Sequence, residues 1–75
     1  MQQFDLANLY VEASVFCAVV ECGSFTKASI KLGIAQSTVS NKVQALETYL
    51  GYALMTRSTR SIKITALGLK LYDFV

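Results

Sequence analysis

The sequence contains no histidine, no tryptophan and no proline, and it has only two cysteines among its 75 residues. Without histidine, the most common general base and the most common zinc ligand in proteins are both missing. The five acidic residues are scattered along the chain, and neither cysteine has a base close to it in the sequence. Because covalent and acid–base catalysis need such paired groups, we expect a domain that is not an enzyme and that holds no metal ion or other cofactor.

Long apolar runs are also absent, since no stretch approaches the roughly 18 uncharged apolar residues that a membrane-spanning helix needs. The start of the chain carries Asp5 and no basic residue ahead of its first apolar stretch, which is not the pattern of a signal peptide. We therefore expect a cytoplasmic protein with no membrane partner. Cys17 and Cys22 would point about 140° apart on a helix, so we expect two buried, reduced thiols rather than a disulfide.

A chain of this length predicts one small domain with a modest core. Its residues are 53% hydrophobic with a mean hydropathy of +0.43, which favours a surface that meets another chain. The net charge is only +2, but it is unevenly distributed: all seven basic residues lie from Lys27 onward, together with just two of the five acids. This asymmetry predicts one positive side and an anionic partner.

Residues 35–50 show the clearest periodicity of the chain. Val39, Val43, Leu46 and Leu50 recur at spacings of four, three and four, which is the inner stripe of an amphipathic helix. The opposite face carries the hydroxyls and amides of Ser37, Asn41, Gln44 and Thr48. Ser40 and Lys42 flank this face. Such side chains can donate and accept the hydrogen bonds that reading base edges requires, although an ordinary solvated face has the same composition.

The segment before this helix favours the base-reading interpretation. Gly23 can end a preceding helix and Ser24 can cap a short helix over residues 25–32, with Phe25, Ala28 and Leu32 facing inward. Gly33 then stops that helix, and Ile34 is expected to be an apolar plug in the turn. A helix, a short turn with glycine and a second helix form a helix-turn-helix, whose second helix enters the major groove.

The same arrangement predicts the residues that would contact DNA. At the start of the second helix the residues closest to base edges are Gln36, Ser37, Thr38, Ser40 and Asn41. The helix over residues 25–32 begins with two hydroxyls and a cation beside free N–H groups, a combination that suits binding of a DNA phosphate. These side chains belong to Ser24, Thr26 and Lys27. Ser24 would cap this helix whether or not the helix binds a phosphate.

The N-terminal segment predicts a helix from about residue 9 to residue 22, after a loose lead-in over residues 1–8. Its apolar side chains form two faces, one of Val11, Val15, Ala18, Val19 and Cys22 and another of Ala13, Phe16, Cys17 and Val20. A helix that is apolar on two sides is either the centre of a core or a surface shared with a partner, and both remain open here.

Beyond Gly51 the sequence predicts two short strands, residues 53–57 and 62–65, joined by a turn over residues 58–61. The tip of this hairpin presents Arg57, Arg60 and Lys63, which suit phosphates or a minor groove, although a solvated charged hairpin is the alternative. Thr65 can cap a last helix from residue 66 to residue 75. That helix is strongly apolar, so we expect it to continue in the natural protein and to pack on a second subunit.

Several motifs in register show that the chain resembles the LysR-type transcriptional regulators. They are Gly23-Ser24-Phe25-Thr26-Lys27-Ala28-Ser29, Leu32-Gly33-Ile34-Ala35-Gln36-Ser37-Thr38-Val39-Ser40, Leu46-Glu47, Leu50-Gly51, Leu54, Arg57, Thr59-Arg60, Ile64-Thr65 and Gly68. The resemblance implies a mainly α winged helix-turn-helix domain over residues 1–65, with three helices and a two-stranded wing. A dimerising linker helix would start at residues 66–75, and an effector domain that senses a small molecule would follow.

The resemblance also implies roles for individual residues. Bases and nearby phosphates would face Gln36, Ser37, Thr38, Ser40 and Asn41, while the DNA backbone would be contacted by Ser24, Thr26 and Lys42. Arg60 would reach the minor groove, and Arg57 matches a strongly recurrent arginine of the family. Lys27, Gln44 and Lys63 complete the DNA-binding residues that we predict.

The chain departs from the family pattern at four places, of which the polar changes bear on the DNA sequence that would be recognised. Ser37 stands where the family often has proline, and Ala35 stands where a capping serine or threonine is frequent. Asn41 replaces a common arginine, which removes a long charged contact. Met55-Thr56 replace the usual phenylalanine and acidic residue, and methionine can fill the same space more flexibly.

Together these patterns predict a sequence-specific DNA-binding transcriptional regulator. The helix over residues 35–50 would read the major groove, and the wing over residues 57–63 would contact the backbone or the minor groove. Two copies would bind a pseudo-palindromic site as a homodimer, with higher oligomers in the full-length protein, and a small-molecule effector would act only through the C-terminal domain. The alternative is a winged helix used for protein contacts, which predicts an acidic or apolar outer face on residues 35–50.

Overall fold

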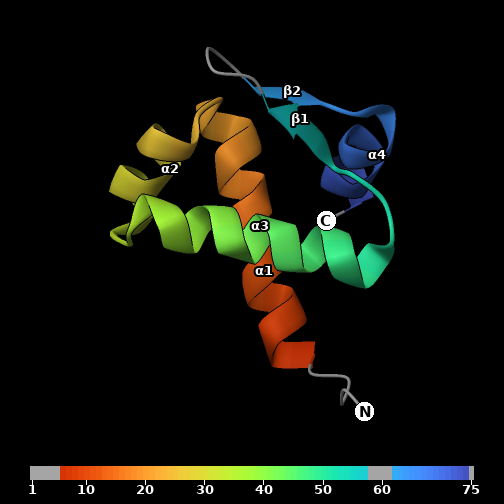
Figure 1. The fold of residues 1–75 in the computed structure, drawn as a ribbon, viewed down its shortest axis with the longest axis horizontal. Helices are drawn as coiled ribbons and strands as arrows, with labels where there is room; N and C mark the ends of the chain where they lie inside the picture. Colours follow the sequence, from red (N-terminus) through yellow and green to blue (C-terminus); the bar gives the residue numbers. More distant parts are fainter. Residues whose placement is uncertain (1–5, 58–61, 75) are drawn as a thin grey trace.

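The computed structural model describes residues 6–57 and 62–74, and these form four helices and one hairpin. The elements in chain order are α1 (Leu6–Cys22), α2 (Phe25–Leu32), α3 (Gln36–Leu50), β1 (Met55–Arg57), β2 (Ile62–Ile64) and α4 (Ala66–Phe74). Figure 1 shows α3 lying across α1, with α2 on one side of the crossing and the hairpin with α4 on the other. This is the mainly helical, winged helix-turn-helix arrangement that the sequence predicts.

The core lies where α1, α2 and α3 meet, and the loop before β1 closes it. Its buried side chains are Val15, Phe16, Ala18, Val19, Ala28, Val39, Val43, Leu46, Leu54 and Met55. The predicted inner stripe of α3 is therefore confirmed, with Leu50 half-buried at its end. Because this stripe fixes the rotation of α3 about its axis, the polar face of the helix must point outward.

Helix α1 begins at Leu6, so the prediction of a loose lead-in through residue 8 is wrong for its last three residues. Nothing between Leu6 and Leu9 breaks a helix, and leucine and alanine both favour one. The second half of α1 is a core helix, whereas the first half projects past α3 and leaves Tyr10 73% and Val11 45% exposed (Figure 1). Val11, which the sequence places on one of two apolar faces, thus lies outside the core.

Helix α2 has the predicted bounds because both of its ends carry strong local signals. The Ser24 hydroxyl accepts a hydrogen bond from the Lys27 N–H at 3.2 Å, which caps the first turn. Gly33 adopts a left-handed φ of 70° and its N–H bonds the last carbonyls of the helix. Leu32 and Ile34 are each 37% exposed, so the predictions of an inward Leu32 and an apolar plug at Ile34 are wrong. They flank the left-handed turn and do not reach the core.

The hairpin is shorter than the sequence predicts. Strands β1 and β2 pair antiparallel, with Met55 opposite Ile64, and the predicted turn over residues 58–61 lies outside the described residues. The first strand does not begin at Ala53, because the backbone there bonds to other partners. The Leu54 N–H donates to the Glu47 carboxylate at 2.9 Å, and the Leu54 carbonyl accepts from the Thr65 N–H at 3.0 Å.

Helix α4 is capped by Thr65 as predicted, since the Thr65 hydroxyl accepts from the Gly68 N–H at 3.0 Å. Gly68 lies so close to the loop before β1 that a Cβ at this position would stand 2.1 Å from the Leu54 carbonyl oxygen. The outer side of α4 leaves Leu69 51% and Phe74 89% exposed. Among the described residues, none of the helices has the length and apolar character needed to cross a bilayer.

Candidate nucleic-acid interface

The outer face of α3 presents the polar residues that the sequence singled out. Ser37, Asn41, Gln44 and Thr48 are exposed, and the edges of the face carry half-buried Thr38, Ser40 and Lys42. Gln36, the first residue of the helix, is exposed as well. The capping position is Ala35, whose side chain makes no capping hydrogen bond. The first N–H groups of α3 therefore have no side-chain cap from this position, which suits an approaching phosphate.

The first turn of α2 lies against the first turn of α3. The Thr26 hydroxyl donates to Oε1 of Gln36 at 3.2 Å, and the Thr26 carbonyl accepts from the Ser29 hydroxyl at 2.7 Å. Ser24 is engaged as the helix cap through its oxygen, which leaves its hydroxyl proton as a donor for a phosphate. The structure thus brings Thr26 and Gln36 into direct contact, which sequence spacing alone did not predict.

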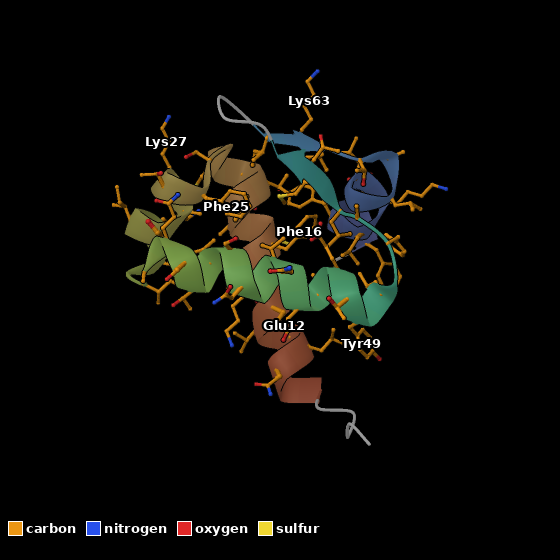
Figure 2. All side chains as sticks on the ribbon, in the orientation of Figure 1. Glu12, Phe16, Phe25, Lys27, Tyr49 and Lys63 are labelled. Carbon is orange, nitrogen blue, oxygen red and sulfur yellow. The ribbon has the colours of Figure 1, made fainter. Side chains whose placement is uncertain are left out.

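Two exposed lysines, Lys27 of α2 and Lys63 of β2, lie on one side of the molecule. Figure 2 shows Lys27 and Lys63 extending in the same direction, while Glu12 of α1 lies on the other side of α3. Lys31 faces a different partner, because its ammonium forms an ion pair with Glu21 at 3.4 Å. For Arg57 the structure describes only the backbone at the end of β1, and Arg60 lies outside the described residues.

The root of the hairpin is fastened to α3 by one carboxylate. Oε2 of Glu47 accepts from the Leu54 N–H at 2.9 Å and from the Met55 N–H at 3.4 Å. These bonds hold the start of β1 against the end of α3, so the distance between helix and hairpin is set by protein contacts. Sequence reasoning missed this role of Glu47. The available signal was an acid that directly follows the buried Leu46 and lies four residues before the glycine that ends the helix.

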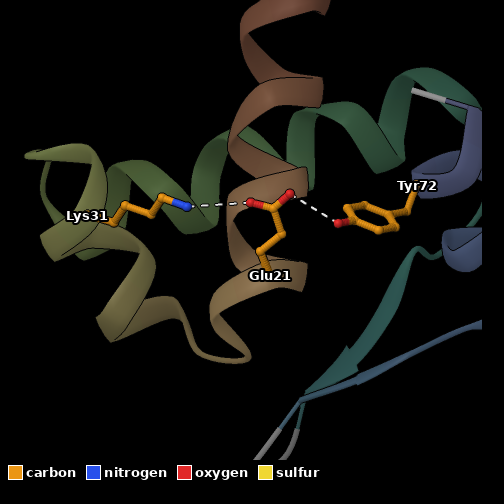
Figure 3. A network of polar contacts seen from close by, with 3 residues as sticks. All are labelled: Glu21, Lys31 and Tyr72. Carbon is orange, nitrogen blue, oxygen red and sulfur yellow. Dashed lines mark hydrogen bonds and ion pairs between the residues drawn. The ribbon is translucent and has the colours of Figure 1, made fainter.

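The other side of the molecule carries a different polar network, centred on Glu21 of α1. Figure 3 shows its carboxylate between α2 and α4: one oxygen pairs with Lys31, and the other accepts from the Tyr72 hydroxyl at 3.0 Å. The hydrogen bond to Glu21 raises the pKa of Tyr72 above its ordinary value, and burial adds to the increase. Glu21 therefore connects α4 to the helix-turn-helix.

An open groove of about 670 Å³ runs between α1 and α4 beside this network. Its lining residues are Tyr10, Ser14, Cys17, Glu21, Tyr72 and Asp73. Cys17 and Cys22 are both free thiols, and both are half-buried rather than buried as the sequence predicts. For Cys17 the reason is that its side chain lines this groove. Burial is the main cause that raises the pKa of the Cys17 thiol, and the negative charge of Glu21 contributes.

Comparison with known proteins locates this architecture within one family. Residues 12–69 match the family model of the bacterial regulatory helix-turn-helix proteins of the lysR family. An HTH-type transcriptional regulator from Xanthomonas campestris is 52% identical over 54 residues, which are 72% of this chain and 16% of the relative. The HTH-type transcriptional regulator BenM from Acinetobacter baylyi is 48% identical over 59 residues, which are 79% of this chain and 19% of BenM. The chain thus spans less than a fifth of either relative.

Solved structures resemble the whole arrangement of helices and hairpin. A complex of the BenM DBD with catB site 1 DNA matches with a TM-score of 0.80 and 42% identity, covering 95% of this chain and 74% of that chain. A complex of the CbnR DBD with DNA matches with a TM-score of 0.84 and 34% identity, covering 87% and 75%. Oxidized OxyR from Corynebacterium glutamicum matches with a TM-score of 0.81 and 40% identity, covering 97% of this chain and 21% of OxyR.

Proposed function

The chain belongs to the LysR family of bacterial helix-turn-helix regulators, and on that premise we propose how it binds double-stranded DNA. The outer face of α3 enters the major groove, and the hairpin contacts the backbone or the adjacent minor groove. The observation that carries this proposal is the exposure of Ser37, Asn41 and Gln44 on a helix whose opposite stripe is buried. Hydroxyls and amides at these positions can meet donors and acceptors on base edges.

The residues fall into three groups by the part of the duplex that they would meet. Bases would be read by Gln36, Ser37, Thr38, Ser40, Asn41 and Gln44. The backbone beside the major groove would be held by Ser24, Thr26, Lys27 and Lys42. The wing would contribute Arg57, Arg60 and Lys63, of which the exposed Lys63 extends on the same side as Lys27 (Figure 2). Phosphate contacts of this kind fix register, whereas the base contacts carry specificity.

We also propose that two copies act together on a pseudo-palindromic site. Residues 1–65 would form the DNA-binding unit and residues 66–75 the start of a linker helix. The exposed apolar side chains that support an association surface are Tyr10, Val11, Leu67, Leu69 and Phe74. Because the relatives are much longer than this chain, a small-molecule effector and higher oligomers would involve a further C-terminal domain. Sedimentation of the chain as a monomer at tens of micromolar would count against dimerisation through these residues.

Binding to DNA also implies a cellular location for the protein and the kinds of interaction that it needs. A regulator that binds chromosomal DNA in bacteria would be cytoplasmic and associated with the nucleoid. We expect no catalysis, cofactor or metal ion in this domain, because DNA binding of this kind requires only hydrogen bonds, charge and shape. The protein-contact alternative is disfavoured, since the outer face of α3 is neither acidic nor apolar.

Selection from random-sequence DNA duplexes at two salt concentrations tests the proposal. We expect the chain to enrich a motif with two-fold symmetry and to lose affinity steeply as salt rises, because bound lysines and arginines displace counterions from phosphates. If the chain retains no duplex even at low salt, the DNA-binding proposal is wrong and a protein partner should be sought instead.

A further inference from the structure

We propose that Thr26 is a positioning residue that sets the base preference of Gln36. It would do so by holding the Gln36 side-chain amide in one orientation, with its N–H groups directed at the DNA. The inference rests on the proposed docking of α3 in the major groove. It goes further by naming the class of base edge that Gln36 meets, which is an edge rich in hydrogen-bond acceptors.

The position of Thr26 is itself fixed by the first turn of α2. The Ser24 cap accepts from the Lys27 N–H at 3.2 Å, and the Ser29 hydroxyl donates to the Thr26 carbonyl at 2.7 Å. These bonds flank Thr26 on both sides within one short helix, and Ala28 of the same turn is fully buried against the core. The Thr26 hydroxyl is therefore presented to Gln36 from a backbone that has little freedom to move.

The hydrogen bond between the two side chains fixes which end of the Gln36 amide points toward α2. The Thr26 hydroxyl donates to Oε1 of Gln36 at 3.2 Å, so the amide oxygen is directed toward α2. Since Oε1 and Nε2 stand on opposite sides of the amide carbon, the two N–H donors are directed away from Thr26. Both residues are exposed, and Gln36 is the first residue of α3, where side chains of a recognition helix approach base edges.

This orientation changes which base a glutamine recognises. A free glutamine reads adenine with both ends of its amide, because the oxygen accepts from N6 while the nitrogen donates to N7. With its oxygen turned toward α2 and one of its two lone pairs accepting from Thr26, Gln36 presents mainly its N–H donors to the groove. These donors fit the N7 and O6 acceptors of guanine or the O4 acceptor of thymine. We therefore expect wild-type protein to disfavour adenine at the position that Gln36 contacts.

Three variants of the 75-residue chain separate positioning from other roles of Thr26. Thr26→Val removes the hydroxyl while keeping the branched shape, and Thr26→Ser keeps the hydroxyl. Gln36→Ala removes the side-chain amide that would contact the base. Each would be measured against a set of duplexes that differ only at one base pair of the selected motif. The Gln36→Ala variant identifies that pair, because without the amide the protein should lose its discrimination among all four bases there by about fivefold or more.

In Thr26→Val we expect the relative affinity for adenine at that pair to rise by about fivefold or more, because the released amide can then bind it at both ends. Thr26→Ser should keep the wild-type preference. A role of Thr26 in phosphate contact alone would instead weaken binding to all duplexes equally and leave the preference unchanged.

The outcomes distinguish this inference from the proposed function. Unchanged base preference in Thr26→Val, repeated in Thr26→Ala, would overturn the positioning role, and so would unchanged discrimination in Gln36→Ala. Either result leaves DNA recognition by the rest of α3 intact, provided that the wild-type chain still enriches a motif. Failure of the wild-type chain to bind any duplex would instead contradict the proposed function.

Discussion

The two sides of this small domain expose opposite kinds of chemistry. On one side, α3 exposes hydroxyls and amides such as Ser37 and Asn41, while Lys27 of α2 and Lys63 of β2 extend in one common direction (Figure 2). On the other side, α1 and α4 expose Tyr10 and Phe74 beside the acidic residues of their groove. Directional polar groups suit the reading of base edges, whereas apolar area suits association with a second chain. One shared core thus supports two surfaces that can be perturbed separately.

The largest effect is expected from Gly68→Ala, which should separate α4 from the rest of the domain. A Cβ at this position would stand 2.1 Å from the Leu54 carbonyl oxygen, so the backbone of α4 or the loop must move. We expect a loss of about 3 kcal/mol in the free energy of unfolding, because a well-packed contact has no room for a methyl group. Urea unfolding followed by circular dichroism measures this change.

The exposed residue Lys70 on the same helix provides the control for Gly68→Ala. Lys70→Ala should alter the free energy of unfolding by less than about 0.5 kcal/mol, as surface substitutions usually do. Equal stability of Gly68→Ala and Lys70→Ala would show that α4 does not pack on the Leu54 loop as described.

A smaller loss is expected from Glu47→Ala, which tests how the hairpin is held to the DNA-facing helix. The substitution leaves the N–H groups of Leu54 and Met55 without their carboxylate acceptor in a partly buried place. We expect a loss of about 2 kcal/mol in the free energy of unfolding, the usual magnitude for a charged hydrogen-bond partner removed from such a site. Glu47→Gln keeps an acceptor oxygen and should lose less, whereas equal losses would mean that the hydrogen bonds contribute little.

Substitutions on the DNA-facing side should leave stability unchanged and alter binding. Asn41→Ala should relax the preference at one base pair by about 1 kcal/mol, whereas Lys63→Ala should weaken binding to all duplexes and lower the salt slope by about one. Arg60→Ala is expected to behave like Lys63→Ala. Binding titrations at several salt concentrations measure both quantities. If Asn41 and Lys63 are both replaced without any effect on binding, the docking of α3 in the groove is wrong.

The smallest expected change in the free energy of unfolding comes from the hydrogen bond between Tyr72 and Glu21, on the side of the molecule away from the outer face of α3. Because the pKa of Tyr72 is raised in the folded protein, the folded state holds this proton more tightly than the unfolded state does. The stabilisation is therefore fully present below the ordinary tyrosine pKa of about 10 and is lost as pH rises through the raised value. The stability difference between wild type and Tyr72→Phe should therefore stay constant up to about pH 10 and shrink as the pH rises further. A difference that stays constant over this range, as expected for Tyr10→Phe, would contradict the role of this hydrogen bond.

Helix caps, glycines and apolar spacing in the sequence predict the helices whose bounds and buried faces depend on nearby residues. The bounds of α2 follow from the Ser24 cap and from Gly33, and the buried stripe of α3 follows from its spacing of valines and leucines. The predicted start of α1 at about residue 9 is too late, because residues 6–8 contain no helix breaker that marks where the helix begins. Ile34 was misjudged because burial depends on where a turn points, which periodicity does not specify.

The features that the sequence did not predict all depend on elements meeting in space. The Thr26–Gln36 bond requires the relative position of α2 and α3, and the Glu47 bonds require the path of the loop before β1. Gly68 belongs to the family pattern, but the reason that no side chain fits there is the close approach of α4 to the Leu54 loop, which the sequence does not reveal. Residue types indicate which side chains could contact bases, whereas contacts such as the one between Thr26 and Gln36 depend on how the helices pack.

The most direct test of the two-sided account follows the amide NMR signals of the chain during titration with its selected duplex. If the outer face of α3 reads DNA, the largest shifts should fall on residues 36–44, around Thr26 and at Lys63, while Tyr10 and the outer residues of α4 change little at constant oligomeric state. Shifts concentrated on α1 and α4, with the signals of residues 36–44 unchanged, would contradict the claim that the outer face of α3 is the surface that reads DNA.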